Sequence, residues 1–414
     1  MGPFMLASMA WRNLWRNTRR TVITLSSIVF AVFVAVMGTG VQDSNWEEIV
    51  NTAARLGGGH VTVQHREYQD KPTLSRTVRA APELLETLGR QPHVTRVVRR
   101  VVGQVMLSTT SDSAGAGFVA YDPAREDETT LSVLKTLHQG QAFTSPDDKG
   151  MVLGVRLAQN LGAEVGTKVV YTLTDKQGEI VNGMARVTGI VKTGSPGADL
   201  GLCFLPLRAV QEVLGYAPDE STQVAVFLHD QRASPAVAER VGALVPGVAS
   251  LTWKETQPDL DNLIAVKKGG MVFLEVLFML LCAAGIFNTL FVSVMERLRE
   301  FGILVAIGMS SARLFLMIML ESLWLALVGL VVSVLALAYP YHFMNTVGVD
   351  ISQRVGAQQA DVAGVGMPMV LKAAIYPENA AAIAVAAILA TLTAGLYPAW
   401  RAGRVEPVES IKLV

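Results

Sequence analysis

The sequence predicts a membrane protein that has four transmembrane α-helices and a large α/β (α+β) extracytoplasmic domain inserted between the first and second of them. Three observations lead to this fold class. The 414-residue chain is 51% hydrophobic and only 17% charged, so it is more apolar than a typical soluble protein. It contains four long apolar runs. The segment between the first two runs has the strand and helix patterns of a soluble domain.

Each apolar run is long enough to cross a bilayer, which takes about 20 mostly apolar residues in an α-helix. We expect the transmembrane helices at 21–42, 267–295, 314–341 and 379–400. Their only acidic residues are Glu275 and Glu321. Acids inside a membrane are costly and often functional, but each of these lies near an end of its apolar run. There a carboxylate can reach lipid headgroups or pair with a basic neighbour, so we interpret both acids as structural.

Basic residues at the ends of the spans predict that both termini lie in the cytoplasm. Arginine is concentrated before the first span, between the second and third, and after the fourth, and basic residues resist translocation. We therefore expect a cytoplasmic amphipathic N-terminus at 1–20 and a cytoplasmic tail at 401–414. The first run is longer than the core of a cleaved signal peptide and no clear A-x-A site follows it, so we expect a signal anchor.

The segment 43–266, placed outside by this topology, repeats one pattern. The strand-like "GHVTVQHREY" is followed by the helix "PELLETLG" and the strand "PHVTRVVRRV". Far downstream, "TQVAVFLHD" is followed by "SPAVAERVGAL" and "PGVASLTWKE" in the same order. Two β-α-β halves, 43–103 and 221–266, thus flank an insertion at 104–220, and we expect the halves to share one sheet. A smaller external loop is expected at 342–378.

The insertion has signals of its own. "KVVYTLTDKQGEIVNGMARVTGIV" predicts a hairpin that turns at 175–178. "RLAQNLG" and "PLRAVQEVLG" each predict a short helix ended by glycine.

Motifs for catalysis are absent from the sequence. It has no G-x-x-x-x-G-K-[ST] loop, no H-E-x-x-H pair and no G-x-S-x-G elbow. We interpret His60 and His65 as surface histidines, and we expect no metal site and no disulfide between Cys203 and Cys282. The formal net charge of zero gives no indication of a nucleic-acid partner.

Between the second and third spans, at 296–313, a run of charges is followed by an apolar patch at 301–309. Nine residues make roughly 14 Å of helix, which is half of what a bilayer needs. The patch therefore predicts a short helix that lies across the cytoplasmic end of a helical hairpin. Either it docks into a groove on a partner or it is buried against its own bundle and lipid headgroups.

The stretch "ERLREFGILVAIGMSSARLFLMIMLES" resembles the signature of FtsX-like ABC transporter permeases, the type VII family that includes macrolide-exporter (MacB) and lipoprotein-releasing (LolC/LolE) subunits. "AWRNLWRNTRRTVITL", "GVRLAQNLGAEVGTKVVYTL" and "LYPAWRAGRVEPVESIKL" are similar to other parts of the same family. The resemblance implies that the two β-α-β halves form a porter subdomain and that 104–220 forms a Sabre subdomain.

The resemblance also implies that the short helix at 296–313 is a coupling helix that docks into an ABC ATPase. ATP and Mg would be bound by that separate subunit, so we expect no cofactor and no catalytic residue on this chain. The residues expected to contact the ATPase are Glu300, Gly302, Ile303, Ala306, Gly308 and Met309.

"LTWKETQPDL" before the second span is similar to the lipoprotein-releasing branch, whose subunits share this length and plan. This resemblance implies mechanotransmission that releases lipoproteins from the bacterial inner membrane toward the outer membrane. The alternatives are MacB-like efflux of drugs or peptides with a periplasmic adaptor, and FtsX-like signalling to a periplasmic hydrolase. The expected partners are the ATPase, a second permease subunit in a homodimer or heterodimer, membrane lipids, and lipoproteins with a periplasmic carrier.

Some side chains of the spans have two interpretations. Candidates to line a lipid pocket, which otherwise face lipid or the helix core, are Met37, Met271, Phe273 and Phe278. Asn288 lies in mid-span and needs a partner, so we expect a hydrogen bond between helices. Gly285 would permit close packing of the same helix face.

Overall fold

The computed structural model describes residues 3–351, 361–362, 365–366 and 370–404, and these form two compact units. The first, which we call the membrane unit, contains the described parts of Met1–Asn45, Ala265–Asp350 and Val370–Val414. The second, which we call the α/β unit, contains Trp46–Ile264 and the described part of Ile351–Met369. The predicted loop at 342–378 and the predicted tail at 401–414 lie partly outside the described residues.

Four helices are long and apolar enough to cross a membrane, by length and composition. They are α2 (Thr18–Leu56), α9 (Pro258–Glu296), α11 (Ser311–Thr346) and α13 (Pro377–Gly403). Helices α2 and α9 are longer than the predicted spans, because their hydrogen-bonded backbone continues past the apolar run into polar sequence. Shorter elements of this unit are α1 (Pro3–Arg16), α10 (Leu298–Ala306), β13 (Val349–Asp350) and β16 (Val370–Leu371).

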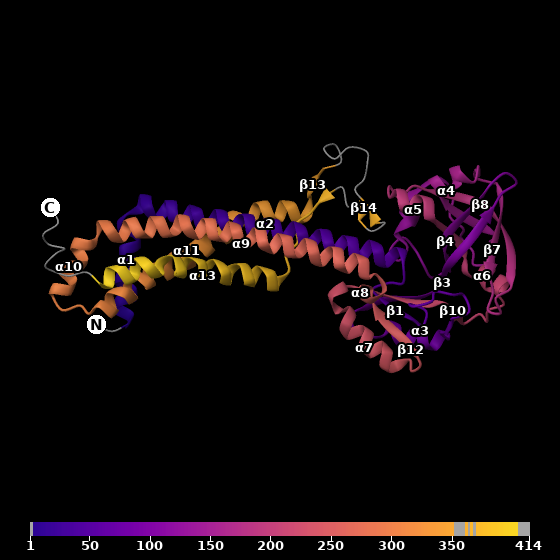
Figure 1. Cartoon of the computed structure of the whole chain (residues 1–414), viewed down its shortest axis with the longest axis horizontal. Coiled ribbons are helices and arrows are strands. Elements are labelled where there is room, and N and C mark those ends of the chain that lie inside the picture. The colour runs from indigo at the N-terminus through magenta and orange to yellow at the C-terminus, as the bar shows by residue number, and fades with distance from the viewer. Residues whose placement is uncertain (1–2, 352–360, 363–364, 367–369, 405–414) are drawn as a thin grey trace. The chain divides into compact units, whose positions relative to one another are not determined.

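The four long helices run alongside one another and share one hydrophobic core, which includes Ile28, Ile286, Leu325 and Ala387 (Figure 1). Glycine allows a close approach at one of these contacts. A Cβ placed on Gly329 of α11 would lie 2.7 Å from Cγ2 of Ile28 on α2. Close packing at small residues is the usual source of helix association in a membrane, where lipid is as apolar as the helix surface.

The α1 and α10 helices lie at the same end of this bundle (Figure 1). Leu6 of α1, Phe301 of α10 and Leu314 of α11 belong to one buried cluster. The indole of Trp324 on α11 also donates a hydrogen bond to the Ala7 carbonyl, at 3.2 Å. The N-terminal helix is therefore packed onto the bundle through apolar side chains.

A ten-stranded sheet forms the centre of the α/β unit, in the order β12-β1-β11-β3-β4-β9-β6-β8-β5, with β7 pairing with β3 and β8. Its strands are β1 (Val61–His65), β3 (Val94–Ser108), β4 (Ser113–Tyr121), β5 (Leu137–Gly140), β6 (Gly150–Gly154), β7 (Lys168–Thr174), β8 (Ile180–Val191), β9 (Leu202–Pro206), β11 (Gln223–Leu228) and β12 (Val248–Thr252). The short pairs are β2 (Val78–Arg79) with β10 (Glu220–Ser221) and β14 (Asp361–Val362) with β15 (Val365–Gly366).

Helices cover and connect these strands (Figure 1). They are α3 (Pro82–Gly89), α4 (Val155–Asn160), α5 (Pro196–Gly201), α6 (Leu207–Leu214), α7 (Ser234–Leu244), α8 (Trp253–Thr256) and the 3₁₀ turns η1 (Ser132–Thr136) and η2 (Gln231–Ala233). Two of the buried clusters lie under the β1, β11 and α7 region and under the β4, β6 and β7 region.

The sheet confirms that the two β-α-β halves meet. Strand β1 pairs antiparallel with both β11 and β12, and β11 pairs with β3, so strands from both ends of the domain alternate. The hairpin of β7 and β8 is also present, with its turn at the predicted place. The boundary expected between 103 and 104 falls inside β3, because that strand continues from the first half into the insertion.

Candidate functional site

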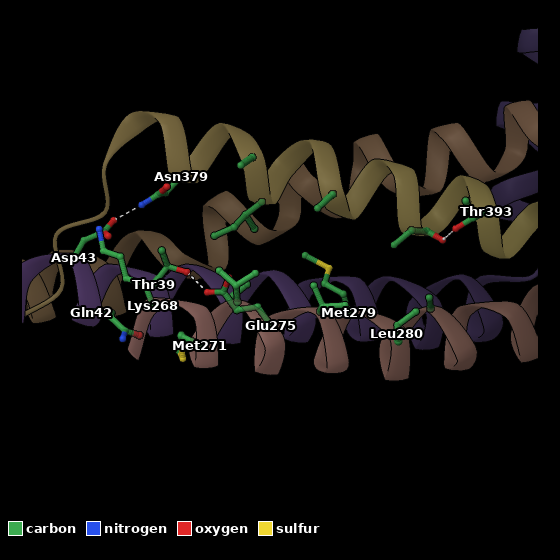
Figure 2. A pocket seen from close by; sticks show the side chains of 18 residues that line it. Thr39, Gln42, Asp43, Lys268, Met271, Glu275, Met279, Leu280, Asn379 and Thr393 are labelled. Carbon is green, nitrogen blue, oxygen red and sulfur yellow. Dashed lines mark hydrogen bonds between the residues drawn. The ribbon is translucent and has the colours of Figure 1, made fainter. Parts of the chain in front are cut away.

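A cavity of about 500 Å³ lies inside the membrane unit, between α2, α9 and α13 (Figure 2). Its wall is mainly apolar, with Met279, Leu280 and Ile383 among the side chains that form it. Polar side chains gather at the other end, where Figure 2 shows Asp43, Gln42, Thr39, Lys268 and Asn379. The cavity is thus amphipathic along its length.

The α9 side of the cavity follows the helical repeat. Lys268, Met271, Glu275, Met279 and Ala283 are three or four residues apart, and all of them line the cavity. Residues with this spacing share one face of an α-helix. This three- or four-residue spacing is visible in the sequence, although no single residue type in it indicates a binding site.

Hydrogen bonds between helices fix the polar end. The Thr39 hydroxyl of α2 donates to the Glu275 carboxylate of α9. Asp43, at the other side of this end, accepts from the Asn379 side chain at 2.7 Å and from the Tyr376 backbone N–H at 3.2 Å. Lys268 makes no ion pair with any residue that the structure describes. The polar end therefore presents an unpaired cation beside a hydrogen-bonded acid.

The structure separates the four residues that the sequence suggested for a lipid pocket. Met271 lines the cavity, whereas Met37 packs against the core of the bundle. Phe273 and Phe278 are exposed on another face of α9 and do not line it. Glu275, which we interpreted as a structural acid near a span end, is instead part of the cavity wall and pairs with Thr39 rather than with a base.

Helix packing also differs from the expectation for α9. Gly285 is exposed, and a Cβ placed on it would meet nothing within 4 Å. Asn288, one turn later, is exposed and makes no hydrogen bond to a residue that the structure describes. The contacts expected at these two positions are not made with any part of the chain that the structure describes, since the faces of α9 that meet the bundle carry Ile286 and Leu290 instead.

The residues expected to contact an ATPase fall into two groups around α10. Ile303, Ala306 and Gly308 are exposed, while Gly302 and Met309 are buried in the chain's own packing. Ile307, which we did not include, is the most exposed apolar side chain here, at 75%. The exposed apolar side chains Ile303 and Ile307, with Ala306 between them, are called the α10 patch below.

Gly308 has a local structural role that explains its position. It has a φ of 101°, which favours glycine. Its N–H donates to the Val305 carbonyl and the N–H of Met309 donates to Leu304, both at 3.0 Å. This is the hydrogen-bond pattern of a Schellman motif, which ends α10 and satisfies its last carbonyls. Met309 is then buried, so the turn holds α10 onto the bundle.

Ion pairs attach the start of α10 to its neighbours. Arg297 donates to Glu321 of α11 at 3.1 Å, and the Asn13 side chain of α1 donates to the same carboxylate at 2.7 Å. Glu321 thus has the basic neighbour that we expected. Glu300 accepts from Arg16 at 2.6 Å. Burial raises the pKa of Glu300, but the Arg16 hydrogen bond and the charges of Arg16 and Arg297 outweigh it and hold that pKa below its ordinary value.

The end of α2 is joined to the sheet of the α/β unit by one buried arginine. The guanidinium of Arg100 on β3 donates to the carbonyl oxygens of Arg55 and Gly57, where α2 ends, and to Thr130 at 2.9 Å. Its remaining donors bind the Glu126 carboxylate. These bonds satisfy carbonyls that a helix end otherwise leaves without partners.

The histidines and cysteines form no cluster. His60, expected at the surface, is buried, and its Nδ1 accepts from the Leu228 backbone N–H at 3.0 Å. Cys203 and Cys282 are free, and burial raises the pKa of the Cys203 thiol. Across the described ranges, no group of three or more His, Cys, Asp or Glu residues has the arrangement of a metal site.

A bundle with four apolar helices that carries a large α/β domain between the first two is the architecture of a membrane permease subunit. Residues 272–407 match the FtsX-like permease C-terminal family, and residues 21–244, more than half of the chain, match the MacB-like periplasmic core domain. The chain belongs to the FtsX- and MacB-like family of ABC transporter permeases. It is therefore an inner-membrane protein whose α/β unit is a periplasmic domain.

Individual relatives come from two branches. The lipoprotein-releasing system transmembrane protein LolC of Xylella fastidiosa (strain 9a5c) is 24% identical over 70% of this chain and 71% of its own length. The macrolide export ATP-binding/permease protein MacB of Acinetobacter baylyi is 23% identical over 79% of this chain and 50% of its own length. The solved periplasmic region of MacB from Actinobacillus actinomycetemcomitans is 16% identical and covers 52% of this chain and 98% of its own, with a TM-score of 0.35.

Proposed function

We propose that this chain is the non-catalytic membrane subunit of an ABC transporter that releases lipid-anchored proteins from the inner membrane toward the outer membrane. ATP hydrolysis takes place on a separate ATPase subunit and drives conformational change in the periplasmic domain. The observation that carries the proposal is the amphipathic cavity between α2, α9 and α13.

The cavity has the chemistry of a site for one amphiphile. Its volume of about 500 Å³ lies within the range of ligand pockets, roughly 300–1,000 Å³. An acyl chain would occupy the apolar part around Met279, where it displaces water at no electrostatic cost. The polar groups next to the acyl chain of a lipoprotein, such as ester and amide carbonyls, would accept from Lys268.

The energy enters at the other end of the membrane unit. Both termini lie in the cytoplasm in this proposal, and the α10 patch docks into a groove of the ATPase. Movement of α10 reaches the bundle through the Arg297 and Glu321 ion pair and the buried Met309. The open face of α9 with Gly285 and Asn288 is available to a second permease subunit, either another copy or a sister chain.

Relatives from both branches match this chain, so the preference for release comes from the cavity. LolC relatives match this chain over most of both lengths, and their name describes lipoprotein release. Efflux in the manner of MacB is the second candidate, because the periplasmic domain matches the MacB-like core family. The chain spans only half of the Acinetobacter MacB, whose name includes the ATP-binding part.

A photocrosslinking experiment tests the proposal. A photoreactive amino acid is placed at Met279, inside the cavity, or at Phe273, on the exposed face of the same helix. The transporter is reconstituted with its ATPase, turnover is blocked with vanadate, and an acylated lipoprotein is added. We expect a crosslink to the lipoprotein from position 279 and little from position 273.

A matched substrate without acyl chains serves as the control. Equal crosslinking of the acylated and non-acylated forms, or equal crosslinking from both positions, would contradict the proposal. Crosslinking of a macrolide or a peptide from position 279, without the lipoprotein, would favour efflux.

A further inference from the structure

A second cavity lies within the α/β unit, and its wall is polar. It has a volume of about 310 Å³ and is formed by the last turns of α2, the start of β3, the end of β11 and the 129–130 segment. The residues that line it include Arg55, Arg96 and His229. No acidic residue belongs to the lining. The proposed release of lipoproteins gives this cavity no role.

The two arginines have donors to spare. Arg96 donates to Asp127 through Nη1 at 2.8 Å, and this carboxylate lies outside the cavity lining. The nearest carboxylate to Arg55 is Glu48, at 4.0 Å, which is at the limit of an ion pair. The side chains of Arg55 and Arg96 are 29% and 40% exposed, so a solute can reach both guanidinium groups.

His60, which lines the cavity, is neutral and already hydrogen-bonded. His60 accepts from the Leu228 N–H through Nδ1, which keeps that nitrogen unprotonated. Its Nε2 lies 2.8 Å from Oδ1 of Asn51. The Asn51 side-chain nitrogen makes no hydrogen bond to a residue that the structure describes, so it adds another available donor. His60 therefore adds no charge to the cavity, and the positive charge comes from Arg55 and Arg96, with the Asp230 carboxylate near His60 opposing part of it.

The carbonyl oxygens at the end of α2 would oppose an anion if they were free. They are not free here, because Arg100 donates to the carbonyls of Arg55 and Gly57. The buried guanidinium of Arg100 thus satisfies these acceptors at the helix end. The donors of Arg55, Arg96 and Asn51 remain for a ligand.

We infer that this cavity binds a phosphate group. Guanidinium groups pair with phosphate in a bidentate, charge-assisted manner. Phosphate also has more acceptor oxygens than a carboxylate, so it can accept from both arginines and from His229 together. Because Arg55 belongs to α2 and Arg96 to β3, a bound phosphate links the end of the first membrane helix to the periplasmic sheet.

Titration calorimetry of the full chain in nanodiscs of digalactosyldiacylglycerol, a lipid that contains no phosphate, tests this inference, with inorganic phosphate as the probe. We expect saturable binding that weakens about tenfold or more in Arg55→Gln and in Arg96→Gln, because each loses charged hydrogen bonds. Arg208→Gln is the matched control, since Arg208 also pairs with an aspartate, at 2.9 Å, but lies outside the cavity. It should bind phosphate as the wild type does.

Addition of phosphatidylglycerol to the nanodisc separates two sources of the phosphate. Loss of the calorimetric signal for inorganic phosphate would identify a lipid headgroup as the occupant, and an unchanged signal would identify a free phosphate. Two results would overturn the inference: no saturable binding in the phosphate-free nanodiscs, or binding that is equal in the wild type and in both cavity variants. Circular dichroism of each variant shows that a loss of binding is not a loss of fold.

Discussion

The guanidinium of Arg100 is paired with the carboxylate of Glu126 inside the α/β unit, and both side chains are completely buried. The same guanidinium donates to carbonyl oxygens at the end of α2. A buried ion pair is costly to form but far more costly to break on one side. The pair therefore anchors the end of α2 to β3 within the α/β unit.

Replacement of Arg100 by Met leaves the Glu126 carboxylate buried without its partner. We expect Arg100→Met to lower the free energy of unfolding of the periplasmic domain by about 3–5 kcal/mol. Limited proteolysis of the full chain in urea measures this loss. Arg90→Met, which removes an arginine from the exposed pair with Glu86, should change little. Equal effects of the two substitutions would contradict the role of Arg100.

His60 predicts a dependence of stability on pH. Burial and the positive charge of Arg55 lower its pKa from 6.5 to about 4, although Asp230 opposes this. Because the folded-state pKa is the lower one, the unfolded chain takes up the proton first as pH falls. The stabilisation is complete above pH 6.5 and decreases between pH 6.5 and about 4, by about 3 kcal/mol in all.

Hydrogen exchange of the Leu228 amide, corrected for the intrinsic effect of pH, measures this change because that amide donates to His60. His60→Gln keeps an acceptor and a donor but does not titrate. We expect protection in the wild type to fall over this pH range and protection in His60→Gln to stay nearly constant. Parallel curves for the two proteins would exclude His60 as the titrating group.

The close contact between α2 and α11 is sensitive to a single methyl group. Gly329→Ala would place a Cβ 2.7 Å from Cγ2 of Ile28, whose branched side chain has few alternative rotamers. We expect a loss of about 1–3 kcal/mol, which is typical of overpacking. Thermal unfolding of the isolated full chain in detergent measures it. Gly285→Ala meets nothing within 4 Å and is the matched control, so similar melting temperatures for both variants would refute the contact.

The Arg297 and Glu321 pair connects the start of α10 to α11 at 3.1 Å. We expect Arg297→Met to reduce substrate-stimulated ATPase activity of the assembled transporter severalfold, because Glu321 is left without its cation in a site where its side chain is only 12% exposed. Arg299→Met is the matched control, because it makes the same change of charge at an exposed position. The exchange of Arg297 and Glu321 should restore part of the activity, and its failure to do so, with intact folding, would argue against a direct pairing effect.

The apolar runs and the strand patterns of this sequence identified the elements, because both are local properties. Helix ends were harder to predict from the sequence. Helix α9 begins at Pro258, well before the predicted 267, since a helix continues into polar sequence when other side chains cover it. In the same way, β3 passes through the expected domain boundary at 103–104, because its pairing with β4 extends the strand.

The cavity depends on pairs that are distant in sequence. Thr39 and Glu275 lie on helices that meet only in the folded chain, so nothing near Glu275 indicates its partner. Large apolar residues such as Phe273 seemed better candidates for a lipid pocket. The cavity instead lies along the helix face of Lys268, Met271 and Met279, and Phe273 is exposed on another face. A search for that repeat, rather than for large side chains, would have found the α9 wall.

The α10 patch offers the most direct test of the proposal that energy from ATP enters this chain there. Ile307→Glu places a charge on a side chain that is 75% exposed, and Ile180→Glu places the same charge on β8 of the periplasmic domain, where the side chain is 73% exposed. The measurement is co-purification of the ATPase with each folded variant, together with the ATPase activity of the complex. We predict that Ile307→Glu loses the ATPase and that Ile180→Glu retains it. A fully active complex with Ile307→Glu, from a chain that is correctly folded, would contradict the proposal.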